Sequence, residues 1–362
     1  MNRILICLVA LIVAASGARS EQEVALPPIG PVLERMLVSY IRPGYDEVNI
    51  AASDLETSLA ELCATPSGEH LEAARSGFRA TVDRWSRMEW LRIGPVMSEN
   101  RLERILFFPD RKGTGRKQVQ AAIASRNESV IKVETLSSQS VAMQGLGALE
   151  FILFGSGSDQ LAGAEASHRC AFARAAAGNL VNLSRELIDG WRDGGELTAA
   201  FLAPAASNPL FRTDAEALNL LLGQMIHGLE AIRDTRINAF LDREDANRDR
   251  PKSALFWRSG MTMASIRANL DGLEAMFNLS GIEIVSQQSA PRLADTIRFE
   301  FDQAVRTASS LDAPVAALLG EPQTRDKLAY LDYAIRIIID RLDQEFAQAG
   351  GLAVGFSFGD GD

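Results

Sequence analysis

Apolar residues recur every three or four positions along most of this chain, which is the period of an amphipathic helix. A clear example is formed by Leu71, Ala74, Phe78, Val82 and Trp85. Ser67 stands where the N-cap of this helix belongs, and Gly94-Pro95 marks its end. The same pattern predicts further helical segments at Gln118–Ser125, Ser138–Phe154, Ala164–Arg192, Ala215–Arg243, Met261–Phe277, Pro291–Ser309 and Arg325–Ala349.

Strand-like segments, in which apolar and polar residues alternate, are absent from the sequence. We therefore predict an all-α fold built from helical bundles. The clearest boundary is residues 200–213, "AFLAPAASNPLFRT", which combines two prolines with small and polar residues. This predicted linker separates residues 21–199, a first bundle, from residues 214–362, a second bundle with the C-terminal tail.

The first twenty residues, "MNRILICLVALIVAASGARS", have the pattern of a secretory signal peptide. Arg3 precedes an apolar run, small residues follow it, and cleavage after Ala18 or after Ser20 fits. Cys7 lies inside the apolar run rather than after a small-residue cleavage site, which disfavours a lipoprotein. Because no later segment approaches about 18 uninterrupted apolar residues, we expect no transmembrane segment in the mature protein.

The charge balance is acidic. The full chain has 37 Lys and Arg against 47 Asp and Glu, and residues 1–20 contain two of the arginines. The mature chain therefore sets 35 basic residues against 47 acidic ones, a net charge of −12. Nucleic-acid binding needs clustered Lys and Arg that neutralise phosphates, so we exclude nucleic acid as a partner.

Two segments depart from the helical pattern. The loop Pro109–Gln118, "PDRKGTGRKQ", holds a local basic cluster, which is typical of a solvated loop; an anion site is the alternative. The tail "GLAVGFSFGDGD" is too rich in glycine for a helix. It either frays, as termini do, or packs back through Phe356 and Phe358.

Two cysteines remain after signal-peptide removal, Cys63 and Cys170. In an oxidising exported setting such an isolated pair is a disulfide candidate, and two buried free thiols are the alternative. Neither cysteine has a CxxC partner, so a metal site built on them is disfavoured.

The stretch "QGLGALEFILFG", residues 144–155, places two glycines and the carboxylate of Glu150 in an apolar segment with helical spacing. Each glycine inside a helix costs about 1 kcal/mol relative to alanine, so this arrangement indicates a close backbone approach or a site. The stretch resembles the GxHxxE motif of the imelysin-like proteins. Gly145 and Glu150 match that motif, and Gly147 stands where its histidine would be.

Other segments resemble the same family in the same order. They are "FRATVDRWSRMEWLRIGPV", "RILFFPD", "FWRSGMTMASIRANLDGL" and "GFSFGDGD". The resemblance implies two helical bundles packed together and export to the bacterial periplasm. Some family members are described as insulin-cleaving metallopeptidases, and others are associated with iron uptake. The implied ligand site consists of Gly145, Gly147, Glu150, Glu89, Arg101, Arg258 and Ser259.

The histidine ligand of the motif does not carry over to this sequence, because Gly147 stands in its place. Glycine offers no donor atom, whereas zinc and iron draw on three or four protein ligands, and HExxH does not occur in the sequence. However, "QMIHGLEAIRD" contains His227 and Glu230 at the HxxE spacing. We hypothesise that both face the cavity of Glu150, so that Glu150, His227 and Glu230 hold a metal. The alternative is a partly exposed helix with an incidental polar pair.

Glu150 also has a structural interpretation, because buried acids are rarely left unpaired. Arg101 and Arg258 are the candidate partners. The remaining histidines are weaker candidates: we expect His70 to face solvent, and the spacing of His168 and Cys170 points their side chains to different faces. We interpret the tryptophans as core and interface residues.

The sequence therefore predicts an exported, non-catalytic protein that binds an iron ion, another divalent metal ion or a small molecule. A metallopeptidase is the alternative, and a structural envelope protein with envelope partners is the second alternative.

Overall fold

The computed structural model describes residues 29–352, and within them every regular element is helical. The predicted all-α fold is confirmed. The predicted signal peptide at residues 1–20 lies outside the described residues, as do Phe356 and Phe358 of the tail. No helix in residues 29–352 is long and apolar enough to cross a membrane.

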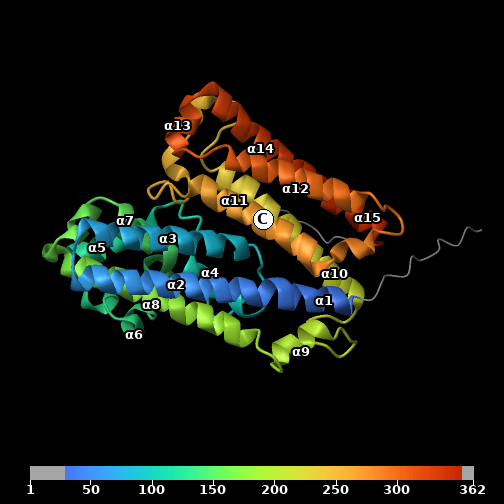
Figure 1. The fold of residues 1–362 in the computed structure, drawn as a ribbon, viewed down its shortest axis with the longest axis horizontal. Coiled ribbons are helices and arrows are strands. Elements are labelled where there is room, and N and C mark those ends of the chain that lie inside the picture. Colours follow the sequence, from blue (N-terminus) through green and yellow to red (C-terminus); the bar gives the residue numbers. More distant parts are fainter. Residues whose placement is uncertain (1–28, 353–362) are drawn as a thin grey trace, which may run out of the picture.

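The first group of helices spans residues 30–202. It comprises α1 (Gly30–Met36), α2 (Arg42–Ala64), α3 (Gly68–Met88), α4 (Arg101–Ile105), α5 (Thr114–Ala124), α6 (Val133–Leu136), α7 (Gly145–Phe154), α8 (Ser167–Gly190) and α9 (Glu196–Leu202). The long helices α2, α3 and α8 lie side by side, with α2 packed against both of the others (Figure 1). Buried residues at helical spacing on α2, such as Leu55, Leu59 and Leu62, form the contact face.

The second group spans residues 214–349. It comprises α10 (Asp214–Ala231), α11 (Thr262–Ser280), α12 (Leu293–Ser309), α13 (Val315–Gly320), α14 (Pro322–Asp340) and α15 (Ala347–Ala349). Helix α12 packs between α11 and α14, and α10 packs against α14 (Figure 1). A π-helical turn, Ile232–Ile237, continues α10.

The two groups meet where α3 packs against α11. A Cβ at Gly272 of α11 would lie 2.2 Å from the carbonyl oxygen of Arg87, so only glycine permits this backbone approach. The apolar core is continuous across both groups. Phe201 and Phe211, which lie inside the predicted linker, are buried in this core and their rings lie 5.8 Å apart. The division at residues 200–213 stays a prediction.

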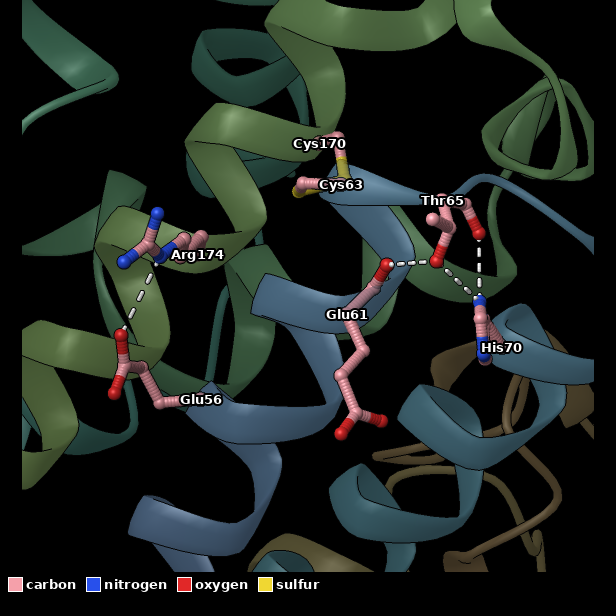
Figure 2. Close-up of a disulfide and its surroundings, with 7 residues drawn as sticks. All are labelled: Glu56, Glu61, Cys63, Thr65, His70, Cys170 and Arg174. Carbon is pink, nitrogen blue, oxygen red and sulfur yellow. Dashed lines mark hydrogen bonds and ion pairs between the residues drawn. A yellow bond between two sulfur atoms is a disulfide. The ribbon is translucent and has the colours of Figure 1, made fainter.

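The disulfide is present between Cys63, at the end of α2, and Cys170, on α8 (Figure 2). The predicted N-cap of α3 is also present, because the Ser67 side chain accepts a hydrogen bond from the His70 backbone N–H at 3.1 Å. His70 is half-buried rather than solvent-facing, and its Nδ1 lies 2.6 Å from the Thr65 carbonyl oxygen.

Some element boundaries differ from the prediction. Helix α3 ends at Met88, six residues before the Gly-Pro pair, and α7 begins at Gly145 rather than near residue 138. Residues 30–64 are missing from the predicted helices, although they form α1, a π-helical turn and α2. The Pro43-Gly44 pair has the composition of a helix break, but Pro43 stands at the second position of α2, directly after the π-helical turn Leu37–Ile41.

Candidate functional site

The site is organised by α7, which carries Glu150 into the interior with 5% of its surface exposed. The C-terminal end of α7 is fixed by Arg169 of α8. Its guanidinium donates to the carbonyl oxygens of Phe151 and Ile152, both at 3.0 Å, and of Ser156 at 2.9 Å. Three satisfied carbonyls at a buried helix end hold the helix, and with it Glu150, in place.

Glu150 is bound by the turn that precedes α11. Its Oε1 accepts hydrogen bonds from the backbone N–H of Arg258 and of Ser259, both at 3.1 Å. The Ser259 hydroxyl lies 3.0 Å from the same oxygen, and the Arg258 guanidinium lies 3.9 Å from Oε2. Burial raises the pKa of Glu150, and the bonds from Ser259 and Arg258 oppose this shift.

The turn reaches this geometry through an unusual backbone conformation. Phe256 is buried and has a φ of 58°, a left-handed value that costs a bulky residue about 1–3 kcal/mol. Its carbonyl oxygen accepts from the Met261 N–H at 3.0 Å, which closes the turn. The Ser259 hydroxyl, 3.1 Å from the same carbonyl, has one proton and donates either there or to Glu150.

A cavity of about 820 Å³ opens beside Glu150, and we call it the α7 pocket. It lies between the loop after α4, the face of α7, the π-helical turn after α10, and residues 250–258. Aromatic rings make up much of its wall. They are Phe107, Phe108, Phe151, Phe256 and Trp257.

The charged residues of the α7 pocket are mostly basic. Five basic side chains line it: Arg111, Arg116, Arg250, Lys252 and Arg258. The acidic ones number three, and each already has partners. Asp110 accepts from the N–H groups of Thr114 and Gly115, Asp234 pairs with Arg233, and Glu150 is bound as described. Among residues 29–352, by contrast, Arg111, Arg116, Arg250 and Lys252 have no ion pair.

Aromatic rings support the basic groups. The Arg258 guanidinium lies 4.4 Å from the centre of the Trp257 ring, and the Lys252 ammonium lies 5.8 Å from it. Burial lowers the pKa of Arg258, Glu150 opposes this, and the charge of Arg116 adds to the lowering. The pocket wall therefore carries concentrated positive charge.

The structure brings together part of the predicted ligand set. Glu150, Arg258 and Ser259 are in direct contact, and Gly147 lines the α7 pocket. Gly145 is buried at the start of α7 with a φ of 65° and packs against the backbone of residues 104–105. Its role is in the backbone, not in the pocket wall.

Three predicted site residues lie elsewhere. Glu89, His227 and Glu230 line a second cavity of about 480 Å³, which we call the α10 pocket. There His227 Nδ1 lies 3.0 Å from Glu230 Oε2, one helical turn away. Phe108 and Pro109 form part of the wall of both pockets. The hypothesis that His227 and Glu230 face the same cavity as Glu150 is therefore wrong, because this segment lies between them.

Arg101 also differs from the prediction. Its guanidinium is bound to Glu186 at 2.6 Å and Glu99 at 3.2 Å, and it lines neither pocket. Of the two candidate partners for Glu150, the structure has Arg258, whereas Arg101, the first residue of α4, is bound to Glu186 of α8.

The metal ion that the family motif implies does not fit these residues. No group of three or more His, Cys, Asp and Glu side chains in the part of the chain described is arranged to hold one. Gly147 supplies no donor, and Oε1 of Glu150 already accepts from Arg258 and Ser259. The predicted metal set of Glu150, His227 and Glu230 is divided between two pockets.

Sequence reasoning missed several residues of these pockets. Arg250 and Lys252 follow a turn with no recognisable motif, and Trp257 was interpreted as a core residue although it lines the α7 pocket. The basic loop that holds Arg111 and Arg116 was the one available signal, through its alternative interpretation as an anion site.

Comparisons with known proteins agree with this architecture. The family model described as Peptidase_M75, Imelysin, matches residues 41–342. Iron-regulated protein A of Synechococcus elongatus is 22% identical over 315 residues, covering 84% of this chain and 82% of that protein. The crystal structure of an imelysin-like protein from Psychrobacter arcticum 273-4 superposes with a TM-score of 0.74 at 17% identity, covering 92% of this chain and all of that one.

A second solved structure, named as an iron-regulated protein A precursor from Parabacteroides distasonis, has a TM-score of 0.70 at 13% identity. The matched region covers 89% of this chain and 96% of the Parabacteroides distasonis chain. These structural similarities concern the fold, whereas the family model covers most of the sequence. This chain belongs to the imelysin family.

Proposed function

We propose that this protein is an exported, non-catalytic binding protein whose ligand is a small anion held in the α7 pocket. The observation that carries the proposal is the charge pattern of that pocket. Four basic side chains there have no ion pair in residues 29–352, while all three acids have partners. A pocket with unpaired positive charge and aromatic walls favours an anion with an apolar or planar body.

If the ligand contains iron, the α7 pocket binds it as an anionic chelate rather than as a bare ion. Two similar proteins carry "iron-regulated" in their names. A bare cation would be repelled by Arg258 and would have to displace the donors on Glu150. A ferric chelate with net negative charge, such as ferric citrate, presents carboxylates to the basic groups and needs no protein ligand to the iron.

The proposed location is the periplasm, reached through cleavage of the predicted signal peptide at residues 1–20. Fractionation of cells that express the full chain, followed by N-terminal sequencing, tests this. A mature protein in the periplasmic fraction that begins after Ala18 or Ser20 is the expected result. Full-length protein in the cytoplasmic fraction alone would contradict it.

The binding test uses isothermal titration calorimetry with ferric citrate, citrate and ferric ion. Lys252 is exposed and lines the pocket, whereas Lys112 is exposed in the basic loop but does not line it. We expect Lys252→Gln to weaken ferric citrate binding about tenfold, the value of one charge-assisted hydrogen bond. Lys112→Gln is the matched control and should leave binding unchanged.

The outcomes separate the three functions considered. Binding of ferric citrate that Lys252→Gln weakens supports the proposal, and equal effects of the two lysine variants would contradict it. Tight binding of ferric ion alone, together with chelator-sensitive cleavage of insulin, would favour the metallopeptidase. No binding by any of the three ligands would favour the structural envelope protein.

A further inference from the structure

The α10 pocket contains a buried polar cluster that the proposed function does not use. The pocket lies between the end of α3, the segment around α4, the end of α10 and α11. Its apolar wall is formed by Trp85, Trp90, Met97, Leu102, Leu106 and Phe108. At the base, Glu89 Oε1 accepts from the guanidinium of Arg236 and, at 2.9 Å, from the Asn269 side-chain amide.

Several polar atoms of this cluster have no protein partner. Asn269 and Trp85 are each 1% exposed and Arg236 is 6% exposed. Within residues 29–352, Asn269 Oδ1, Trp85 Nε1, Arg236 Nη1 and the second carboxylate oxygen of Glu89 are all buried without a hydrogen bond. Leaving one such group without a hydrogen-bond partner costs about 1–3 kcal/mol, so these four atoms around one cavity call for a polar partner, which ordered water or a polar ligand would supply.

The charged residues that line the α10 pocket indicate the charge of its ligand. Acidic side chains outnumber arginines in the α10 pocket: Glu89, Glu103, Glu230 and Asp234 against Arg92 and Arg236. Three of these acids are paired, Glu89 with Arg236, Glu230 with His227 and Asp234 with Arg233, whereas Glu103 and Arg92 have no ion pair among the described residues. Two of the unmet atoms, on Glu89 and Asn269, are acceptors that a cationic N–H group would satisfy.

The aromatic side chains of the α10 pocket also favour a positively charged ligand. Trp85 and Trp90 line the cavity, and indole rings attract cations through their π faces. The Phe108 ring already receives the Arg236 guanidinium at 5.0 Å. Acidic groups with aromatic walls are the usual surroundings of a bound ammonium group.

We propose that the α10 pocket is a second binding site, for a protonated amine with an apolar body. The ammonium group donates to Glu89 and Asn269, and the apolar body lies against Trp85, Trp90 and Leu106. Trp85 Nε1 and Arg236 Nη1 remain as donors for a hydroxyl or carbonyl of the same ligand. This site is separate from the α7 pocket and takes a ligand of the opposite charge.

The test compares three probes that share one apolar body: phenethylamine, phenethyl alcohol and 3-phenylpropionate. Each is titrated into the full mature protein and followed by calorimetry and tryptophan fluorescence. We expect phenethylamine to bind at least tenfold more tightly than the alcohol, and the carboxylate not to compete with it. Equal binding of amine and alcohol, or no binding of the amine, would overturn the proposal.

Variants locate the site. Glu89→Gln keeps the shape but removes the charge, and we expect it to weaken amine binding at least tenfold. Glu89 is the ion-pair partner of the buried Arg236, so Glu89→Gln could fail to fold. A variant at the edge of the pocket, Glu230→Gln, tests the location in that case. Glu230→Gln should weaken amine binding about threefold to tenfold, while Glu99→Gln, an exposed residue outside the pocket, should not. Unchanged amine binding in Glu230→Gln would refute this location, whatever the outcome for ferric citrate.

Discussion

The two glycines of the "QGLGALEFILFG" segment should respond in opposite ways to the same substitution. Gly145 has a φ of 65°, and a Cβ there would lie 2.2 Å from the Ile105 carbonyl oxygen and 2.4 Å from that of Arg104. The left-handed conformation costs an alanine about 1–2 kcal/mol, and forcing a methyl group into packed backbone costs about 1–3 kcal/mol more. Gly145→Ala should therefore lower the free energy of unfolding by about 3 kcal/mol.

Gly147 is the matched control, two residues along the same helix. A Cβ there would meet nothing within 4 Å, because the position faces the α7 pocket. Alanine in place of an exposed helical glycine stabilises a protein by about 0.5–1 kcal/mol, so the two variants should differ by about 4 kcal/mol.

Urea unfolding followed by far-UV circular dichroism measures both values, and tryptophan fluorescence followed in parallel checks that the transition has two states. If Gly145→Ala is as stable as the parent protein, Gly145 is not needed for the approach between α7 and residues 104–105. If Gly147→Ala is clearly less stable than the parent, the open space assigned to this position is wrong.

Three further predictions concern stability. Serine at both Cys63 and Cys170 removes a link between positions 107 residues apart, which should cost about 4 kcal/mol in urea unfolding and abolish any effect of reductant. Arg169→Met removes the donor to the carbonyl oxygens of Ile152 and Ser156 and one of the two donors to that of Phe151, and should cost about 3 kcal/mol in thermal unfolding. Arg174→Met on the exposed face of α8 should cost under about 0.5 kcal/mol. Burial and the neighbouring carboxylates raise the pKa of Glu274 to about 7, above its ordinary value of 4.5. The contribution of protonated Glu274 to the free energy of unfolding is therefore complete below pH 4.5 and is lost as the pH rises through 7. Between these limits the parent protein should lose about 1 kcal/mol more than Glu274→Gln, after discounting for solvent screening, and parallel urea stability curves would contradict this.

The sequence predicted the helices well because helical periodicity is a local property. Ser67 caps α3 as predicted, since a cap depends only on the residues that follow it. The omission of α2 has a local cause as well: Pro43-Gly44 has the composition of a break, although helical residues precede it without interruption, through the π-helical turn Leu37–Ile41.

The site was predicted less completely, because it depends on contacts between distant segments. Glu150 and its partners Arg258 and Ser259 were anticipated through a motif in each half of the chain. The placement of Phe108 in the wall between the pockets of Glu150 and His227 could not be predicted from the sequence, because no local pattern reports which loop will separate two helices. HxxE spacing places His227 next to Glu230, and the structure has the polar pair that was the alternative interpretation, but the spacing does not report which cavity the two residues face.

The two pockets share one wall and differ in the charged residues that line them, and in the proposals made above this difference would provide specificity. Phe108, Pro109, Asp234 and Thr235 line both cavities, so two ligands would be separated by a single layer of residues. Without charge, ligands with similar apolar bodies would enter either cavity. An anion in the α10 pocket would meet the carboxylates there, and an amine in the α7 pocket would meet its basic groups. Like charges brought together at short range cost several kcal/mol, roughly. If the two proposals hold, each pocket would therefore exclude the ligand of the other by repulsion as much as it would favour its own by attraction.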